Sequence, residues 1–372
     1  MFSKKKFLSE LEEYIPGKSI EDTAREFRLD PKKIIKLASN ENNFGPSSVV
    51  KKAIIENIKG INIYPRYPTE LKGLISKYLK IPKENIVFGA GGDDVLDVLG
   101  KIIIDKNDET IITSPTFAMY EFVTRICGGR PKFIQRDENF DVPINRLLSS
   151  ISKKTKMIFL CSPNNPTGNV MERKAVEKIL KETRAYVYVD QAYIDFSDKK
   201  YSVSDLVPCY KNLIVLRTFS KAFALAGLRF GYGIIPQHLV KDFEKVRLPF
   251  SINNLAIVAA KTALEDQEYL KKILRLIKEG REYLRKNIRF KTYSSQANFI
   301  LVDVSPNFAK DIVFELQKKG IITRNCAIFG KGMEHFVRVS VGTPTQNKKL
   351  VRELNSFYKN LTPLEIFSKI IN

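Results

Sequence analysis

The fold class is decided by the stretch KMIFLCSPNNPTG, residues 156–168. Its first half, Lys156–Cys161, is almost entirely apolar and too short for a helix, which predicts a buried strand. The second half places Asn164 and Asn165 between two prolines, which fix the backbone so that an amide side chain points in one direction. A buried strand that ends in such a turn indicates a sheet with a ligand site at its edge.

The same arrangement recurs on both sides of this stretch. Amphipathic segments such as Asp94–Ile104 and Arg173–Thr183 predict helices between short apolar runs. This alternation predicts an α/β fold whose mostly parallel sheet is covered by helices on both faces. Because ligands bind beyond the carboxyl ends of such strands, the residues that follow each run are the candidates for chemistry. The further runs are Ile86–Gly89, Thr110–Thr113, Ala185–Val189 and Leu213–Leu216.

From about Leu248 the pattern changes to a smaller α+β unit. We expect three parts: an N-terminal arm (1–44) that packs on the small domain, a large domain (45–247) and a small C-terminal domain (248–372). The last part is predicted from a long helix at Asn254–Lys286, strands at Ala297–Val304, Ile321–Arg324 and Phe336–Val341, and helices at Asn307–Lys319 and Lys348–Leu361.

The composition is that of a soluble globular protein, with 44% hydrophobic and 28% charged residues. The formal net charge is +21, but the lysines are spread along the chain among Asp and Glu, so we expect solvated helix faces and no nucleic-acid binding. A positive field would still attract anionic substrates. No apolar run spans a bilayer, and Glu10 and Glu12 interrupt the position of a signal peptide, so we expect a cytoplasmic protein without membrane contact. Four scattered cysteines and two histidines predict neither disulfides nor a metal site.

Two of the strand ends carry candidates that have equally plain structural explanations. The glycine-rich string that includes Gly92 and Asp93 precedes a helix, so its backbone amides either cradle a phosphate or only form a turn. Phe117 follows the run Thr110–Thr113, where its ring either stacks on a flat heterocycle or fills the core.

The next two strand ends carry a carboxylate and an amine. Asp190 ends an apolar run, so it needs a cationic partner, either a protonated pyridine nitrogen or an arginine. The hydroxyl of Tyr193 could reach the same ligand. Lys221 stands between Ser220 and an apolar run, with no other charge before Arg229, and burial there would lower its pKa and make it a nucleophile toward an aldehyde. The competing interpretation is a lysine that extends to solvent from a half-buried turn.

These strings together resemble the histidinol-phosphate aminotransferase family, a branch of the class I/II fold-type-I enzymes that use pyridoxal 5'-phosphate. The matching motifs are S-P-N-N-P-T-G at 162–168, D-x-A-Y at 190–193 and S-K-A-x-A-x-A-G-L-R at 220–229. The resemblance extends from Tyr14–Lys18 and Leu37–Pro46 to Arg338–Thr343, so it covers essentially the whole chain.

The resemblance implies a role for each candidate. Lys221 carries the cofactor as a Schiff base and moves the proton, and Asp190 keeps the pyridine nitrogen protonated. Tyr193 and Asn165 bind the ring oxygen, while Phe117 stacks on the ring. The cofactor phosphate is held by Gly92, Asp93, Ser220, Arg229 and a tyrosine from the other subunit of a homodimer with shared active sites, for which we prefer Tyr64 to Tyr67.

For the substrate, the resemblance implies that Arg338 binds the α-carboxylate and that Arg324, with Tyr14 and Asn42, binds a distal phosphate. Arg324 could also be an ordinary surface arginine. We therefore expect an aminotransferase that acts between glutamate or 2-oxoglutarate and a small phosphorylated amino or keto compound similar to histidinol phosphate.

Some residues depart from the family pattern. Asn43 replaces a proline and Gln191 replaces a glutamate, and the segment 324–338 is closer to threonine-phosphate decarboxylases. The alternative is therefore a decarboxylase of threonine phosphate or serine phosphate. A non-catalytic protein of this fold would be expected to lose Lys221 or Asp190, and both are present.

Overall fold

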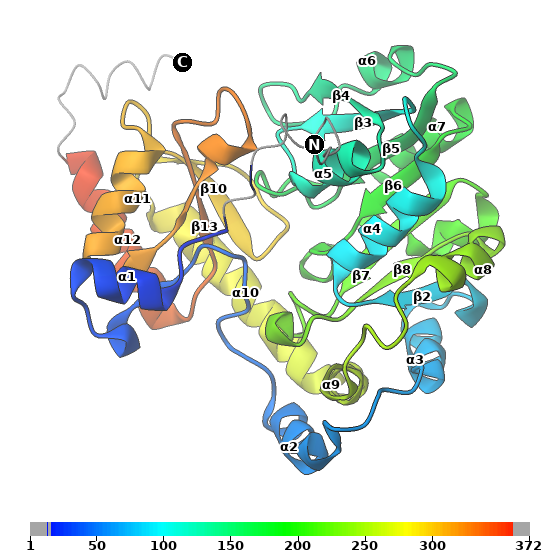
Figure 1. The fold of residues 1–372 in the computed structure, drawn as a ribbon. Coiled ribbons are helices and arrows are strands. Elements are labelled where there is room, and N and C mark those ends of the chain that lie inside the picture. The colour runs from blue at the N-terminus through cyan, green and yellow to red at the C-terminus, as the bar shows by residue number, and fades with distance from the viewer. Residues whose placement is uncertain (1–12, 14–15, 360–372) are drawn as a thin grey trace, which may run out of the picture.

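The computed structural model describes residue 13 and residues 16–359. Its larger part is built on a seven-stranded sheet, whose arrangement can be followed in Figure 1. Only β8 runs against its neighbours, so the sheet is mostly parallel, as the sequence predicts. In spatial order the strands are β2 (Ile86–Gly89), β8 (Gly231–Ile234), β7 (Leu213–Thr218), β6 (Tyr186–Asp190), β5 (Thr155–Cys161), β3 (Glu109–Ser114) and β4 (Arg130–Gln135).

Helices cover both faces of this sheet. Successive residues of a strand point to opposite faces, so they contribute to two different apolar clusters. Ile158 belongs to one apolar cluster and Phe159 to the other, and Val187 and Tyr188 divide in the same way. One face carries α4 (Gly92–Ile103), α5 (Met119–Ile126) and α8 (Gln237–Val246); α3 (Thr69–Leu79), α6 (Ile144–Ser149) and α7 (Arg173–Glu182) contribute to the other cluster.

All five predicted runs of the large sheet are strands, but two strands were not predicted. β4 contains Arg130, Pro131 and Lys132, which hide the apolar pattern of a strand. β8 is rich in glycine for a steric reason: a Cβ on Gly231 would lie 2.6 Å from the backbone of Gly91. Glycine is required there because β8 passes against the turn that begins α4.

The smaller unit has a four-stranded antiparallel sheet in the order β12-β13-β10-β9. The long helix predicted at Asn254–Lys286 is wrong in one respect: it is two helices. Asp266 ends the first and accepts a hydrogen bond from the amide of Tyr269 (3.2 Å), which caps the second. The elements are α9 (Asn254–Glu265), α10 (Gln267–Asn287), β9 (Lys291–Thr292), β10 (Phe299–Asp303), α11 (Ala309–Lys318), β12 (Arg324–Asn325), β13 (Phe336–Ser340) and α12 (Pro344–Lys359).

The N-terminal segment packs on elements of the smaller unit. β1 (Ile35–Lys36) pairs in parallel with β11 (Ile321–Ile322), while α1 (Ile20–Phe27) contacts α11 and α2 (Ser48–Asn57) packs on α9. In Figure 1 the two units lie side by side and this segment runs between them. The domain boundaries at 44/45 and 247/248 stay predictions. Across residues 13 and 16–359, none of the helices combines the length and apolarity that crossing a bilayer requires.

Candidate active site

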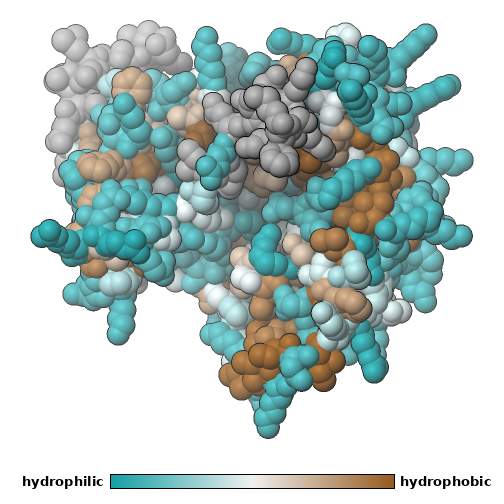
Figure 2. Space-filling model, viewed as in Figure 1, coloured by the Kyte–Doolittle hydropathy of each residue, from teal (hydrophilic) through white to brown (hydrophobic). Residues whose placement is uncertain are grey.

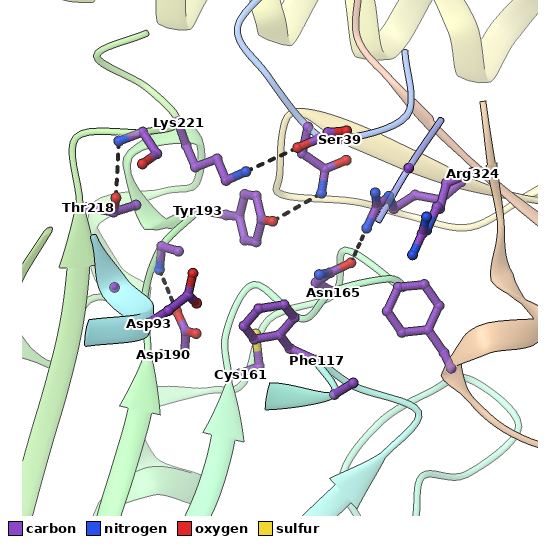
Figure 3. A pocket seen from close by; sticks show the side chains of 18 of the residues that line it. Ser39, Asp93, Phe117, Cys161, Asn165, Asp190, Tyr193, Thr218, Lys221 and Arg324 are labelled. Carbon is purple, nitrogen blue, oxygen red and sulfur yellow. Dashed lines mark hydrogen bonds between the residues drawn. The ribbon is translucent and has the colours of Figure 1, made fainter. Parts of the chain in front are cut away.

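A cavity of about 540 Å³ opens at the carboxyl ends of the large sheet's strands (Figure 3). Strands β5, β6 and β7 bring Cys161, Asp190 and Thr218 to its wall, and the smaller unit contributes Arg324 and Arg338. The site thus lies where parallel sheets place their ligands. The predicted candidates that line it are Gly92, Asp93, Phe117, Asn165, Asp190, Tyr193, Ser220, Lys221, Arg229, Arg324 and Arg338.

Asp190 is a buried carboxylate whose hydrogen-bond partners carry no charge. Its Oδ2 accepts the hydroxyl of Tyr120 (2.8 Å) and its Oδ1 accepts the amide of Ala192 (2.9 Å). Burial raises the pKa of Asp190 from 3.8 to about 6, with the two hydrogen bonds acting in the opposite direction. A cation in the cavity would offset this desolvation, so the site suits a positively charged ring nitrogen.

Lys221 extends into the same cavity from the turn after β7. Its Nζ donates a hydrogen bond to the carbonyl of Ser39 (3.2 Å) and lies 5.5 Å from the centroid of the Tyr193 ring. Burial, and then the positive charge of Arg338, lower the pKa of Lys221 to about 8. A larger fraction of this amine is therefore neutral near pH 7 than of an exposed lysine, which suits reaction with an aldehyde.

Tyr193 and Asn165 present polar groups to the space above Asp190. The hydroxyl of Tyr193 accepts a hydrogen bond from Nδ2 of Asn40 (3.0 Å), and burial raises its pKa. Asn165 uses its Oδ1 to accept a hydrogen bond from Nη1 of Arg338. Because that oxygen is engaged, the amide nitrogen of Asn165 is the atom left to serve a ligand.

Arg338 is buried but its hydrogen bonds are incomplete. Its Nη2 donates to the carbonyl of Ala38, while its Nε has no hydrogen-bond partner among the described residues. On the next strand, Arg324 is its register partner and also lines the cavity. Two buried guanidinium groups on neighbouring strands form a strongly positive wall that suits an anion.

The turn into α4 forms a second anion site. Gly91 has a φ of 94° and precedes Gly92 and Asp93 in the first turn of the helix, where backbone amides are free to bind. Nη2 of Arg229 lies 3.2 Å from Oδ2 of Asp93, and a Cβ on Gly91 would lie 2.6 Å from the same nitrogen. Ser220 also lines the cavity. The set provides amide, hydroxyl and guanidinium donors that suit a phosphate.

Phe117 lines the cavity and packs edge-on against Tyr120, with ring centroids 5.7 Å apart. This position leaves the ring available to a flat ligand while Tyr120 holds it from the side. Tyr120 therefore has two functions in the site, because its hydroxyl also binds Asp190.

Two of the predicted residues that the structure describes, Asn42 and Tyr64, do not line the cavity. Asn42 is bound within the chain: its Nδ2 donates to the carbonyl of Ala222 (3.0 Å) and its Oδ1 accepts the amide of Phe44 (3.2 Å). Tyr64 is 76% exposed and packs on Phe250, with ring centroids 4.7 Å apart. Tyr14 lies outside the described residues.

Other residues of the site were not identified from the sequence, namely Ser39, Asn40, Tyr120, Cys161 and Thr218. Tyr120 lies in the first turn of α5, three residues after Phe117, and nothing in the sequence alone indicates that its hydroxyl reaches Asp190. Ser39 and Asn40 fall inside the recognised segment 37–42, but nothing in the sequence alone indicates that they approach Lys221 and Tyr193.

The site as a whole fits a planar, cationic, aldehyde-bearing heterocycle with a phosphate group. The buried carboxylate, the amine with lowered pKa, the aromatic ring and the donors around α4 each match one part of such a molecule. Arg324 and Arg338, which we call the arginine wall, suit a second, anionic molecule.

Comparison with known proteins finds a matching family and relatives that are similar over almost the whole chain. The family model described as aminotransferase class I and II matches residues 32–354. A curated histidinol-phosphate aminotransferase of Methanosarcina mazei is 50% identical over 94% of this chain and 95% of its own. Among solved structures, that of a histidinol-phosphate aminotransferase from Clostridium acetobutylicum is 27% identical, with a TM-score of 0.82, and covers 88% of this chain and 100% of its own. The one from Sinorhizobium meliloti, in complex with pyridoxal-5'-phosphate, is 22% identical with a TM-score of 0.87 and covers 97% and 99%.

Proposed function

This chain belongs to the class I and II aminotransferase family, whose members use pyridoxal 5'-phosphate, and we propose that it transfers an amino group between glutamate and histidinol phosphate or a close relative of it. The chain is a pyridoxal-phosphate-dependent aminotransferase. The observation that carries the choice of substrate is the 50% identity, over nearly the full length, to a curated histidinol-phosphate aminotransferase.

The residues of the cavity divide among the parts of the cofactor. We assign the ring nitrogen to Asp190, the ring oxygen to Tyr193 and Asn165, and the ring face to Phe117. When bound, pyridoxal phosphate supplies an aldehyde that accepts the amino group and a ring that delocalises the electron pair left on the substrate's α-carbon. The phosphate is assigned to the amides of Gly92 and Asp93, to Ser220 and to Arg229.

Lys221 is the residue assigned to proton transfer at the substrate's α-carbon. With a pKa of about 8, its amine can accept a proton and return it near neutral pH. The carbonyl of Ser39 holds Nζ at 3.2 Å, on the side of the cavity that faces the ring of Tyr193. This contact gives the free amine a defined position over the site.

The substrate's anionic groups are assigned to the arginine wall. Arg338, fixed by Asn165 and Ala38, is proposed to bind the carboxylate of glutamate, and Arg324 a phosphate. Both side chains are buried, so each forms stronger hydrogen bonds with an anion than an exposed arginine does. The +21 net charge would increase the local concentration of such substrates.

The hypothesis of a decarboxylase, which came from the segment 324–338, is less well supported than that of an aminotransferase, because the relatives that match nearly the whole chain are named histidinol-phosphate aminotransferases. The decisive experiment mixes the cofactor-loaded enzyme with L-glutamate alone and follows the visible absorption. Conversion to the amino form of the cofactor, with formation of 2-oxoglutarate, is expected. An unchanged spectrum together with carbon dioxide release from threonine phosphate or serine phosphate would contradict the proposal.

We further propose a cytosolic homodimer in which Tyr64 reaches the cofactor phosphate of the other subunit. Figure 2 shows an exposed apolar patch at the lower end of the view, where Figure 1 places α2, and a second subunit could cover it. Tyr64 follows α2 in the sequence and is 76% exposed. Tyr67 is less suitable, because its hydroxyl donates to Glu244 (2.6 Å) within the same chain. The exposed apolar residues of this region are Val49, Ile55, Ile58, Ile61, Ile63, Leu248 and Phe250.

A further inference from the structure

Three consecutive residues of the N-terminal segment each bind a different side chain of the candidate active site. The carbonyl of Ala38 accepts Nη2 of Arg338, the carbonyl of Ser39 accepts Nζ of Lys221, and the side chain of Asn40 reaches Tyr193. The first two contacts are made by backbone atoms, which any residue could supply. The third contact is made by the side chain of Asn40, so it is the one of the three that a substitution would remove.

The orientation of the Asn40 amide follows from its bonds to Ser340. The backbone N–H of Asn40 donates to Oγ of Ser340 (3.0 Å), and the hydroxyl of Ser340 then donates its own hydrogen to Oδ1 of Asn40 (3.2 Å). With its oxygen engaged in this way, the amide must turn Nδ2 toward Tyr193. Asn298 holds the backbone of the same residue, donating from Nδ2 to the carbonyl of Asn40 (3.0 Å).

This orientation determines which way the phenol of Tyr193 can donate. The Tyr193 oxygen accepts a hydrogen from Asn40 at 3.0 Å, so its own hydrogen is available only in another direction. The ring of Tyr193 packs edge-on against Phe299 and its hydroxyl lies in the cavity, where the proposed ring oxygen of the cofactor is the remaining acceptor. An acceptor in place of Asn40 would take that hydrogen away from the cavity.

We propose that Asn40 is a positioning residue that makes Tyr193 a hydrogen-bond donor toward the ring oxygen of the cofactor. The proposal rests on the assignment of Tyr193 made above and adds a residue that does not itself contact the cofactor. The backbone is also consistent with a selected asparagine at this position. Asn40 has a φ of 56°, a left-handed conformation that is unfavourable for most residues but tolerated by asparagine, and its side chain is almost fully buried.

Several charged or titratable groups face Tyr193 and must be separated from the effect of Asn40. Arg338 approaches from β13, Lys221 from the turn after β7, Asp190 from the end of β6 and Cys161 from β5. The charge of Arg338 and the hydrogen bond from Asn40 both lower the pKa of Tyr193, but burial outweighs them and keeps the phenol protonated. The phenol therefore retains the hydrogen that the proposal requires.

The test is a pH titration of the visible absorption of the cofactor-loaded enzyme, without substrate. A donor at the ring oxygen stabilises negative charge there and so lowers the pH midpoint of the absorption change. Asn40→Asp replaces the donating nitrogen with an acceptor and is expected to raise the midpoint by about 1 pH unit. Asn40→Gly, which accepts the left-handed backbone and removes the side chain, should raise it by less. An unchanged midpoint in Asn40→Asp would overturn the proposal.

A double-mutant cycle shows whether Asn40 acts through Tyr193. Tyr193→Phe alone should raise the midpoint, and adding Asn40→Asp should then produce little further change. If Asn40→Asp shifts the midpoint equally in the Tyr193→Phe background, the aspartate acts by direct charge and the proposal is wrong. Asn43→Asp is the matched control, because it introduces the same charge three residues away, where Asn43 donates to the carbonyl of Val341 (3.3 Å).

The result can be separated from a failure of the proposed function. The titration needs no amino substrate, so it remains valid whether or not histidinol phosphate is the substrate. A wild-type protein that binds no pyridoxal phosphate would contradict the cofactor assignment instead. A loaded wild-type enzyme with unaltered midpoints in the Asn40 variants would contradict only the role of Asn40.

Discussion

Arg324 and Arg338 face each other as register partners on the antiparallel strands β12 and β13, and they are only 8% and 5% exposed. Like charges directly opposite on paired strands destabilise a sheet. Burial increases that repulsion, because less water screens it. Both guanidinium groups line the cavity, so an anionic substrate bound beside them would reduce this repulsion.

Replacing Arg324 with Ala should weaken binding of the phosphorylated substrate much more than binding of glutamate. Loss of a hydrogen bond to a charged group costs about 1.5–3 kcal/mol, so KM for the phosphorylated substrate should rise about 10- to 100-fold. Arg324→Lys keeps the charge but cannot form two parallel hydrogen bonds to the phosphate, so its KM for the phosphorylated substrate should lie between those of the wild type and Arg324→Ala. Steady-state kinetics of each half-reaction provide the measurement, and equal effects on both substrates would remove the phosphate role.

Lys221→Ala should abolish covalent attachment of the cofactor. Borohydride reduction of the wild-type protein loaded with pyridoxal phosphate should add one stable adduct to the chain, located at Lys221 by peptide mass spectrometry. Lys261→Ala is the matched control, because Lys261 is an exposed lysine paired with Glu70 (3.0 Å) and should not affect labelling. Retention of the adduct in Lys221→Ala would refute the lysine assignment.

Asp190→Asn should stabilise the cofactor-free protein while removing most of its activity. The folded-state pKa of Asp190 is raised from 3.8 to about 6, so the fold disfavours the ionised carboxylate. This penalty is absent below pH 4, grows between pH 4 and 6 and is complete above pH 6. The gain from the substitution should therefore be larger at pH 8 than at pH 5, on the order of 3 kcal/mol at the higher pH.

Thermal unfolding of the cofactor-free proteins at the two pH values provides this measurement. Asp242→Asn serves as the control, because it removes an exposed carboxylate paired with Lys245 and should change the unfolding temperature little at either pH. An equal gain for Asp190→Asn at pH 5 and pH 8 would show that ionised Asp190 carries no penalty in the fold.

Tyr64→Phe and Tyr67→Phe should have opposite consequences. Tyr64→Phe removes an exposed hydroxyl, so it should leave stability unchanged but weaken cofactor binding about 10-fold if that hydroxyl reaches the other subunit's phosphate. Tyr67→Phe leaves Glu244 without its 2.6 Å partner and should cost about 1 kcal/mol of stability, with cofactor binding unchanged. Cofactor titration and thermal unfolding of both variants distinguish the two tyrosines, and the reverse pattern would assign the role to Tyr67.

Much of the large sheet could be predicted from the sequence because its strands are buried on both faces. Runs such as Leu213–Leu216 are continuously apolar for that reason, and the residues after them fall at one edge by topology. Asp190 could be selected because a charged residue at the end of a buried strand is unusual, and Lys221 because it stands between Ser220 and an apolar run with no other charge before Arg229. The strands that were missed contain residues whose type is set by a contact with another element and not by the apolar pattern of a strand. Gly231 is an example, because the backbone of Gly91 leaves no room for a side chain there.

The polar contacts around the site could not be predicted in the same way. Asn40 and Tyr193 are far apart in the sequence, and only the packed structure places Nδ2 of one at 3.0 Å from the hydroxyl of the other. Asn42 was selected instead, because its residue type matched a family motif, yet its side chain binds Ala222 and Phe44. Local patterns therefore identified the groups that carry the chemistry but not the groups that orient them.

The bond between Asn40 and Ser340 has a consequence for how the enzyme is made. The two residues are separated by 300 positions, so a growing chain on the ribosome exposes the first of them long before the second exists. Asp190 and Lys221 emerge in that interval, and Arg338 follows more than 100 residues after Lys221. A nascent chain that stalls or is cut before β13 therefore carries the reactive amine but not the residues that position it, so the site can form only after β13 has been synthesised.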